Sequence, residues 1–103
     1  MILVYTTFEA DAMIATASEW WQVNRPKAPT LLLEELHFAK ERLERFPEAG
    51  RLVRRRGFPG LRRLLLRRTR YHLYYRYFAE HGEVWVVALW AAMRRRAPKL
   101  KRR

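Results

Sequence analysis

The stretch YHLYYRYFAEHGEVWVVALW, residues 71–90, decides the fold of this 103-residue chain. It holds five Tyr or Phe rings, two Trp and few charges. Aromatic and β-branched residues fill two runs, 71–79 and 83–91, and such runs are typical of strands. Gly82 lies between them and permits the positive φ of a hairpin turn. We therefore predict two antiparallel strands joined at this glycine.

Alternation along the first of these strands separates its side chains onto two faces. Both faces are partly aromatic, so we expect one face to pack on helices and the other to meet a partner. The first face carries Tyr71, Leu73, Tyr75 and Tyr77, and the second carries His72, Tyr74, Arg76 and Phe78.

The residues before this stretch predict a third strand. LRRLLLRR, residues 61–68, forms an apolar and basic run that favours a strand paired with 71–79. Residues 51–60, RLVRRRGFPG, contain two glycines and a proline and predict a loop or an irregular edge.

The first half of the chain predicts one strand and two helices. ILVYTT, residues 2–7, is short, apolar and β-branched, which favours a strand. Thr6 and Glu9 have capping-box spacing, so we expect a helix to begin at Thr6 and to end at NRPKAP, residues 24–29. Its apolar stripe comprises Ala10, Met13, Ile14, Ala17, Trp20 and Trp21.

A second helix is predicted from Thr30 to the stop signals Pro47 and Gly50. Its stripe repeats at helical spacing and comprises Leu32, Leu36, Ala39, Leu43 and Phe46. We interpret its other face as solvated, with Glu34, Glu35, Lys40, Glu41, Arg42, Glu44 and Arg45.

These elements define an α+β domain that spans residues 1–103. It comprises an N-terminal strand, a two-helix hairpin and an antiparallel three-stranded meander, with the helices on one sheet face. Residues 99–103 form a basic tail, for which disorder is an expectation.

The charge is concentrated in the second half of the chain. Residues 1–50 hold 5 Lys or Arg and 8 Asp or Glu, whereas residues 51–103 hold 17 and 2. An asymmetry of this size predicts an acidic partner. The chain has no cysteine, which excludes disulfides and thiolate metal sites. No apolar run approaches the roughly 20 residues of a membrane span, and no signal peptide is recognisable, so we expect a cytoplasmic protein with no membrane partner.

No catalytic motif stands out in the sequence. The histidines, His37, His72 and His81, show no metal spacing, and no glycine loop suited to phosphate occurs, so we expect no metal and no cofactor. His72 is the one candidate for proton transfer, because alternation places it on the face of Arg76. The alternative interpretation is a hydrogen-bonded histidine on the sheet surface.

Arginines interleaved with strand residues suggest a surface for phosphate or carboxylate. Arg63 and Arg67 alternate with leucines, and Arg76 comes from the next strand. RRR at 54–56 and KLKRR at 99–103 leave two interpretations open, binding charge or solvated loop and tail.

Four ordered segments carry a family resemblance: FPEAG (46–50), LRRLLL (61–66), YHLYYR (71–76) and RRRAPKL (94–100). In this order and spacing the chain resembles the ParE branch of the RelE/ParE toxin superfamily over about residues 3–100. The resemblance implies a toxin of a bacterial type II toxin–antitoxin pair. It also implies a cognate acidic antitoxin that neutralises the toxin and forms a hetero-oligomer with it.

The resemblance implies one of two activities. The RelE branch cleaves mRNA in the ribosomal A site with strand-borne basic residues and often a tyrosine near the C-terminus. Arg63 matches one basic position, but Leu65 falls where a second would stand, His72 falls where arginine is usual, and no tyrosine follows Tyr77. The ParE branch acts on DNA gyrase and has no catalytic constellation.

The incomplete cleavage set favours a gyrase inhibitor that acts by binding. A ribosome-dependent mRNA endoribonuclease is the alternative, and a non-toxic basic binding module is the third hypothesis. One departure from the family pattern counts against the ParE branch: Ala91 and Ala92 stand where many relatives have a histidine just after the last strand.

For a gyrase-directed toxin that acts by binding, we also predict which residues bind. The expected target surface comprises Arg63, Arg67, Arg76, Arg94, Arg95 and Arg96. The expected antitoxin contacts are Trp20, Trp21, Tyr74, Phe78 and Trp85. No catalytic residue is assigned for the gyrase inhibitor, whereas the ribonuclease alternative would use Arg63, His72 and Arg95.

Overall fold

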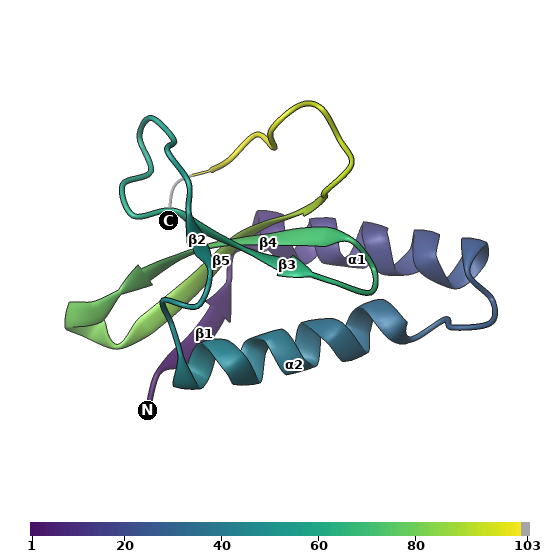
Figure 1. The fold of residues 1–103 in the computed structure, drawn as a ribbon, viewed down its shortest axis with the longest axis horizontal. Coiled ribbons are helices and arrows are strands. Elements are labelled where there is room, and N and C mark those ends of the chain that lie inside the picture. The colour runs from purple at the N-terminus through teal and green to yellow at the C-terminus, as the bar shows by residue number, and fades with distance from the viewer. Residues whose placement is uncertain (102–103) are drawn as a thin grey trace.

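The structure is a computed structural model and describes residues 1–101 (Figure 1). Two helices pack on a five-stranded mixed sheet in the order β1-β5-β4-β3-β2. The α+β prediction, with both helices on one sheet face, is confirmed. The elements are β1 (Leu3–Thr6), α1 (Phe8–Asn24), α2 (Leu31–Arg45), β2 (Arg51–Leu52), β3 (Arg62–Leu66), β4 (Tyr71–Phe78), a 3-10 turn (Ala79–His81) and β5 (Glu83–Ala91).

The predicted meander forms the centre of the sheet. β3 pairs with β4 and β4 pairs with β5, both antiparallel. Gly82 follows the 3-10 turn with φ of 63°, which agrees with the positive φ expected there. The sheet is wider than the meander, because β1 pairs in parallel with β5 and the two-residue β2 pairs with β3. The predicted irregular edge over 51–60 therefore begins with a short strand.

The first helix begins one residue later than predicted. Thr7 is the N-cap, and its side-chain oxygen accepts a 3.1 Å hydrogen bond from the Ala10 backbone N–H. Thr6 instead donates its hydroxyl to the Asp11 carboxylate at 2.5 Å. Both threonines stabilise the first turn of α1, but only the second one caps it.

The main core lies between the helices and the sheet. Leu32, Ala39 and Leu43 of α2 are buried there, and Leu36 packs against them in part. Alternate β4 residues, Leu73 and Tyr75 among them, face the same core, as the period-two pattern predicts.

The prediction that Phe46 belongs to the α2 stripe is wrong. The helix ends at Arg45, and Phe46 has φ of −132° and ψ of 74°, which lies outside the helical region. The backbone therefore carries the ring away from the sheet, and 62% of Phe46 is exposed.

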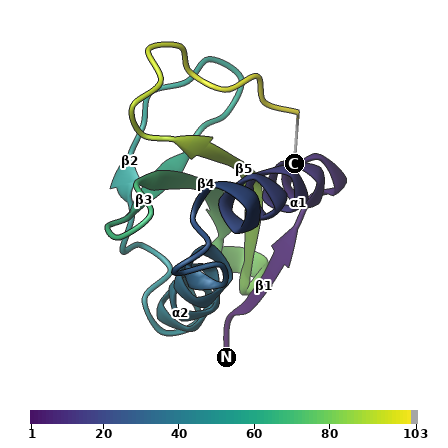
Figure 2. The same cartoon turned by 90° about the vertical axis from the view of Figure 1, so that its right-hand side faces the viewer.

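A second apolar cluster covers part of the opposite sheet face, which we call the far face. Phe58, Leu61, Tyr74, Val87 and Ala88 are buried there, and Val53, Trp90 and Leu100 pack around them. The loop 53–61 and residues 92–101, called the C-terminal arm below, fold over this face (Figures 1 and 2). The chain itself therefore covers part of the surface expected to meet a partner.

The C-terminal arm is held by its own side chains. Pro98 is buried, and Leu100 packs on the second cluster. The expected disorder of residues 99–103 stays a prediction, and residues 102 and 103 lie outside the described part of the chain.

Glu35 holds the turn between β3 and β4. Its carboxylate accepts hydrogen bonds from the backbone N–H of Arg68 at 2.9 Å and of Thr69 at 2.8 Å, and from the Thr69 hydroxyl at 2.6 Å. Arg70 in this turn has φ of 66°. The interpretation of Glu35 as part of a solvated face is wrong, because the turn brings three donors to its carboxylate.

Candidate partner-binding surfaces

Arg63 and His72 lie side by side on the far face. Arg63 stands opposite Tyr74, and His72 stands opposite Leu65 on one side and Trp90 on the other. Burial, with the Arg63 and Arg70 charges adding to it, lowers the pKa of His72 below its usual 6.5. The imidazole is therefore uncharged at neutral pH and contributes no positive charge to this surface.

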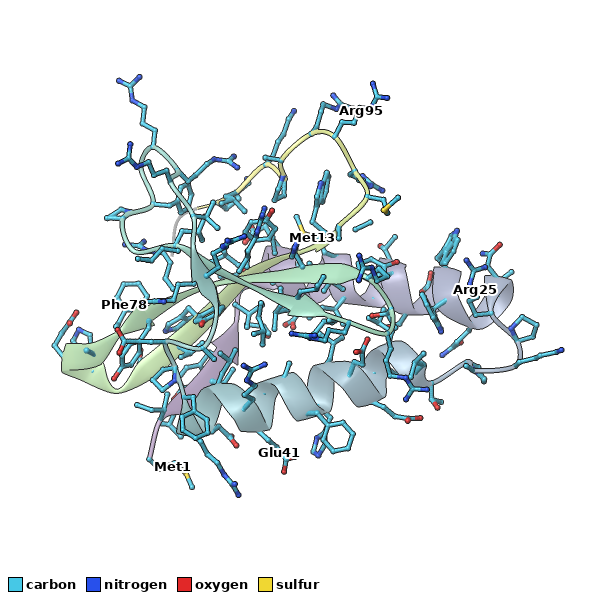
Figure 3. The ribbon with its side chains drawn as sticks, in the orientation of Figure 1. Met1, Met13, Arg25, Glu41, Phe78 and Arg95 are labelled. Carbon is cyan, nitrogen blue, oxygen red and sulfur yellow. The ribbon has the colours of Figure 1, made fainter. Side chains whose placement is uncertain are left out.

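The C-terminal arm displays its three arginines next to this pair. The Trp90 Nε1–H donates a 2.7 Å hydrogen bond to the backbone oxygen of Arg96, and the Arg94 guanidinium lies 4.4 Å from the Trp90 ring centroid. Arg94, Arg95 and Arg96 are exposed, and Arg95 projects from the outermost bend of the arm (Figure 3). Trp90 thus positions the arm, with the Arg94 guanidinium stacked on its ring and Arg95 directed outward.

A second surface lies at the other end of β4. The Arg76 guanidinium is 4.9 Å from the Phe78 ring centroid, and its Nε donates to the Pro59 oxygen at 3.1 Å. On the neighbouring strands Trp85 stacks on Tyr5 at 4.9 Å. Arg76 stands opposite Trp85, and Trp85 stands opposite Tyr5, so the half-buried Arg76 and Trp85 and the exposed Tyr5 are neighbours across three strands.

A third region lies at the end of α1. Trp20 is 46% exposed, and the Arg25 guanidinium lies 5.1 Å from its ring centroid. Phe78 and Arg25 occupy opposite ends of the long axis of the molecule (Figure 3). The exposed aromatic residues expected to bind an antitoxin therefore do not form one compact site.

Two of the expected antitoxin contacts require correction. Trp21 is 7% exposed, packs edge-on against Tyr71, and donates its Nε1–H to the Ala28 oxygen at 2.8 Å. Tyr74 is 5% exposed, because the loop 53–61 covers it. Both rings are occupied within the fold, so a partner cannot contact them without displacing the chain.

The expected target arginines are also divided. Arg63 and Arg76 lie on β3 and β4, whereas Arg67 is exposed in the turn after β3, which ends at Leu66. The placement of Arg67 on a strand face with Arg63 is therefore wrong, because the strand stops before it.

The structure reveals an apolar groove that the sequence patterns missed. A hollow of about 520 Å³ lies between α2 and β1. β1 is an edge strand, and its outer side pairs with no other described strand. Leu33 is exposed and does not belong to the apolar stripe of α2. An apolar residue outside the stripe was the one feature of the sequence that could have indicated this groove. The groove is lined by Val4, Tyr5, Thr6, Ile14, Leu33, Leu36, His37, Lys40, Leu43, Leu73 and Val86.

Within residues 1–101, no group of three or more His, Cys, Asp or Glu side chains could hold a metal ion. None of the helices in that range has the length and hydropathy needed to cross a bilayer.

The sequence and the fold match those of known toxins. The sequence model described as the ParE toxin of type II toxin-antitoxin system, parDE, matches residues 7–96. The chain belongs to this family, within the ParE/RelE toxin superfamily of type II toxin–antitoxin systems. No curated protein sequence matches the chain.

Solved structures of toxin–antitoxin systems have the same fold. The chromosomal ParDE toxin–antitoxin system from P. aeruginosa contains a chain with TM-score 0.70 and 19% identity, with 88% of this chain and 96% of that chain covered. The toxin–antitoxin complex RelBE2 from Mycobacterium tuberculosis gives TM-score 0.63 and 25% identity, over 88% and 92%. The intact E. coli RelBE complex gives TM-score 0.58 and 22% identity, over 91% and 100%.

Proposed function

We propose that this toxin inhibits DNA gyrase by binding to it, and that a cognate acidic antitoxin neutralises the toxin. The observation that supports a binding mechanism is the composition of the far face around His72. The imidazole there is uncharged at neutral pH and lies between Leu65 and Trp90. RNA cleavage needs a positioned base and acid, together with charge on the phosphate. Arg63 and Arg70 supply charge beside the histidine, but residues 51–79 and 84–103 contain no Asp or Glu that could serve as its acid–base partner.

The gyrase-binding surface that we propose is the basic part of the far face. Arg63 and Arg76 supply half-buried guanidinium groups on the sheet, and Arg94, Arg95 and Arg96 supply exposed ones on the arm. Guanidinium groups pair bidentately with carboxylates, so an acidic patch on the target would be a suitable counterpart. Binding energy at such an interface is distributed over several side chains.

The antitoxin, in this proposal, occupies the apolar groove between α2 and β1 and reaches the exposed Trp20 and the half-buried Phe78 and Trp85. An extended or helical segment can bury its apolar side chains in such a groove, and the edge strand β1 offers unpaired backbone groups. Acidic residues of the antitoxin would then be attracted by the basic half of the toxin, which makes the association rate sensitive to salt.

The experiment measures gyrase supercoiling and ribosome-dependent mRNA cleavage with the same purified protein, with and without the antitoxin. We expect loss of supercoiling and no cleavage. Arg63→Gln, Arg76→Gln and Arg95→Gln should each weaken inhibition by a moderate factor, whereas His72→Ala should retain most of it. Unimpaired supercoiling at saturating toxin would contradict the proposal.

A ribosome-dependent endoribonuclease is the second candidate, and one observation favours it. His72 is uncharged and adjacent to Arg63, so its imidazole is in the protonation state of a general base. Codon-linked mRNA cleavage that His72→Ala abolishes by orders of magnitude would establish this function and displace the first. A protein with neither activity would support the third hypothesis, a non-toxic basic binding module.

A further inference from the structure

Two basic triplets, distant in sequence, lie on the same side of the molecule. Residues 54–56 are three arginines in the loop between β2 and β3, and residues 94–96 are three arginines in the C-terminal arm. Both segments rise from the far face on the same side of the molecule (Figures 1 and 2), and the arm triplet also lines a hollow beside Met13 of α1. We call these six arginines the basic loop pair.

Each triplet is anchored at both ends. In the first loop Val53 donates its backbone N–H to the Leu61 oxygen at 2.8 Å, and Phe58 and Leu61 are buried in the second cluster. In the arm, the Ala92 N–H donates a 2.9 Å hydrogen bond to the Arg70 oxygen before the triplet, and the Trp90 hydrogen bond to the Arg96 oxygen and the buried Pro98 hold the chain at its end. Binding a ligand therefore costs little ordering of the backbone.

The positive charge of the loop pair is not neutralised within the described residues. The two ion pairs found there, Arg62 with Glu48 and His37 with Glu41, lie outside it. No Asp or Glu occurs in residues 51–79 or 84–103. Six guanidinium groups on one side of the molecule, none of them in an ion pair, make a strong site for an anionic polymer.

The chemistry of the loop pair favours a phosphate backbone over bases. Phe58 is buried, and Trp90 is already covered by the Arg94 guanidinium and engaged by the Arg96 carbonyl. Single strands are held mainly by stacking of bases on exposed rings, and these loops offer no such ring. A duplex, whose phosphates form a regular outer surface, is the better match.

The same residues give no means of preferring RNA. Residues 51–66 and 84–103 contain no Ser, Thr, Asn, Gln, Asp or Glu, so no side chain there can accept a hydrogen bond from a 2′-hydroxyl group. Side chains that read base edges with both a donor and an acceptor are missing for the same reason. We propose that the basic loop pair binds duplex DNA through its phosphates, without sequence preference and without gyrase.

The test is fluorescence anisotropy of a short labelled DNA duplex with the purified protein, at salt concentrations from about 50 to 200 mM. If four or five arginines each neutralise one phosphate, the slope of log K against log salt should be about −4. Replacing either triplet by glutamine should reduce the slope by about 2, and replacing both should remove most of the binding.

A matched control removes the same charge elsewhere. Lys27, Arg42 and Arg45 are exposed on α2 and the loop before it, so their replacement by glutamine also lowers the net charge by three. This variant should keep the wild-type slope. Equal loss in the control and in the triplet variants would show that only the net charge acts, and would overturn the proposal.

Competitors of equal length identify the partner. Duplex DNA of unrelated sequence should displace the label as well as the original duplex does, and single-stranded DNA should compete more weakly. Tighter binding of single-stranded DNA or of duplex RNA would overturn the assignment to duplex DNA. Because no gyrase is present, DNA binding can succeed or fail independently of gyrase inhibition, and the two proposals are distinguishable.

Discussion

The Tyr75 hydroxyl accepts a 2.8 Å hydrogen bond from the backbone N–H of Gly50, across the junction of the β4 core and the chain entering β2. Tyr75 is fully buried, and its burial raises the pKa of the phenol, while the Gly50 hydrogen bond acts in the opposite direction. Gly50 is packed so closely that an added Cβ would lie 2.7 Å from the Tyr75 ring and 2.9 Å from the Arg63 oxygen. This contact connects the end of the helical half to the sheet.

Tyr75→Phe should destabilise the fold by about 1–3 kcal/mol, because the buried Gly50 N–H would lose its acceptor. Urea unfolding at equilibrium measures this difference. Tyr77→Phe is the matched control on the same β4 face, since the Tyr77 side chain is only half-buried. Equal effects of the two substitutions would show that the Gly50 contact contributes nothing specific.

Leu43→Ala should lower the free energy of unfolding by about 2–5 kcal/mol. The Leu43 side chain of α2 is completely buried in the core, so its truncation leaves a cavity. Phe46→Ala should change the stability by less than about 1 kcal/mol, since that ring is largely exposed. Thermal unfolding of both variants provides the comparison. The reverse order would mean that α2 presents a different face to the sheet.

Glu35→Gln should destabilise the protein by about 1–3 kcal/mol, because an amide presents one oxygen where the carboxylate accepts three hydrogen bonds from Arg68 and Thr69. Amide hydrogen exchange of the 67–70 turn should accelerate in this variant. Glu34→Gln, one position away on the exposed face, should leave exchange in the turn unchanged. Protected turn amides in Glu35→Gln would contradict this role.

His72 should make stability depend on pH. Its pKa is lowered in the folded protein, so the unfolded chain takes up this proton first as the pH falls. The contribution of neutral His72 to the free energy of unfolding is complete above the pKa of about 6.5 that histidine has in the unfolded chain. This contribution decreases as the pH falls toward the lower pKa of His72 in the folded protein. The decrease in Tm between about pH 7.5 and about pH 5 should therefore be smaller in His72→Gln than in the wild type. If Tm decreases as much in His72→Gln as in the wild type over this pH range, groups other than His72 cause the decrease.

The elements with strong periodicity could be predicted from the sequence. β3, β4, β5 and most of the α2 stripe follow from alternation and from three- and four-residue spacing, since each buries one face. Phe46 fits the spacing but lies beyond the last helical residue, and spacing alone does not reveal where the backbone leaves the helix.

The candidate surfaces were harder to predict. Trp21 and Tyr74 are aromatic residues that a partner could use, yet local pattern does not show that the 24–30 connection and the loop 53–61 cover them. Glu35 resembles its solvated neighbours in sequence, and only the position of the 67–70 turn in space distinguishes it. The groove at β1 depends on the parallel pairing of β1 with β5, which brings together distant parts of the chain.

The pairing of β1 with β5 determines when the chain can complete its fold during translation. β1 is the first strand to be made, but its pairing partner β5 is the last, with Leu3 beside Glu83. Until β5 is available, β1 has no strand to pair with, and the helices lack the strand that completes the sheet beneath them. Contacts between such distant parts of the chain form late, because their loop-closure cost is high. A ribosome translating this protein therefore makes nearly all of the chain before the chain can complete its fold.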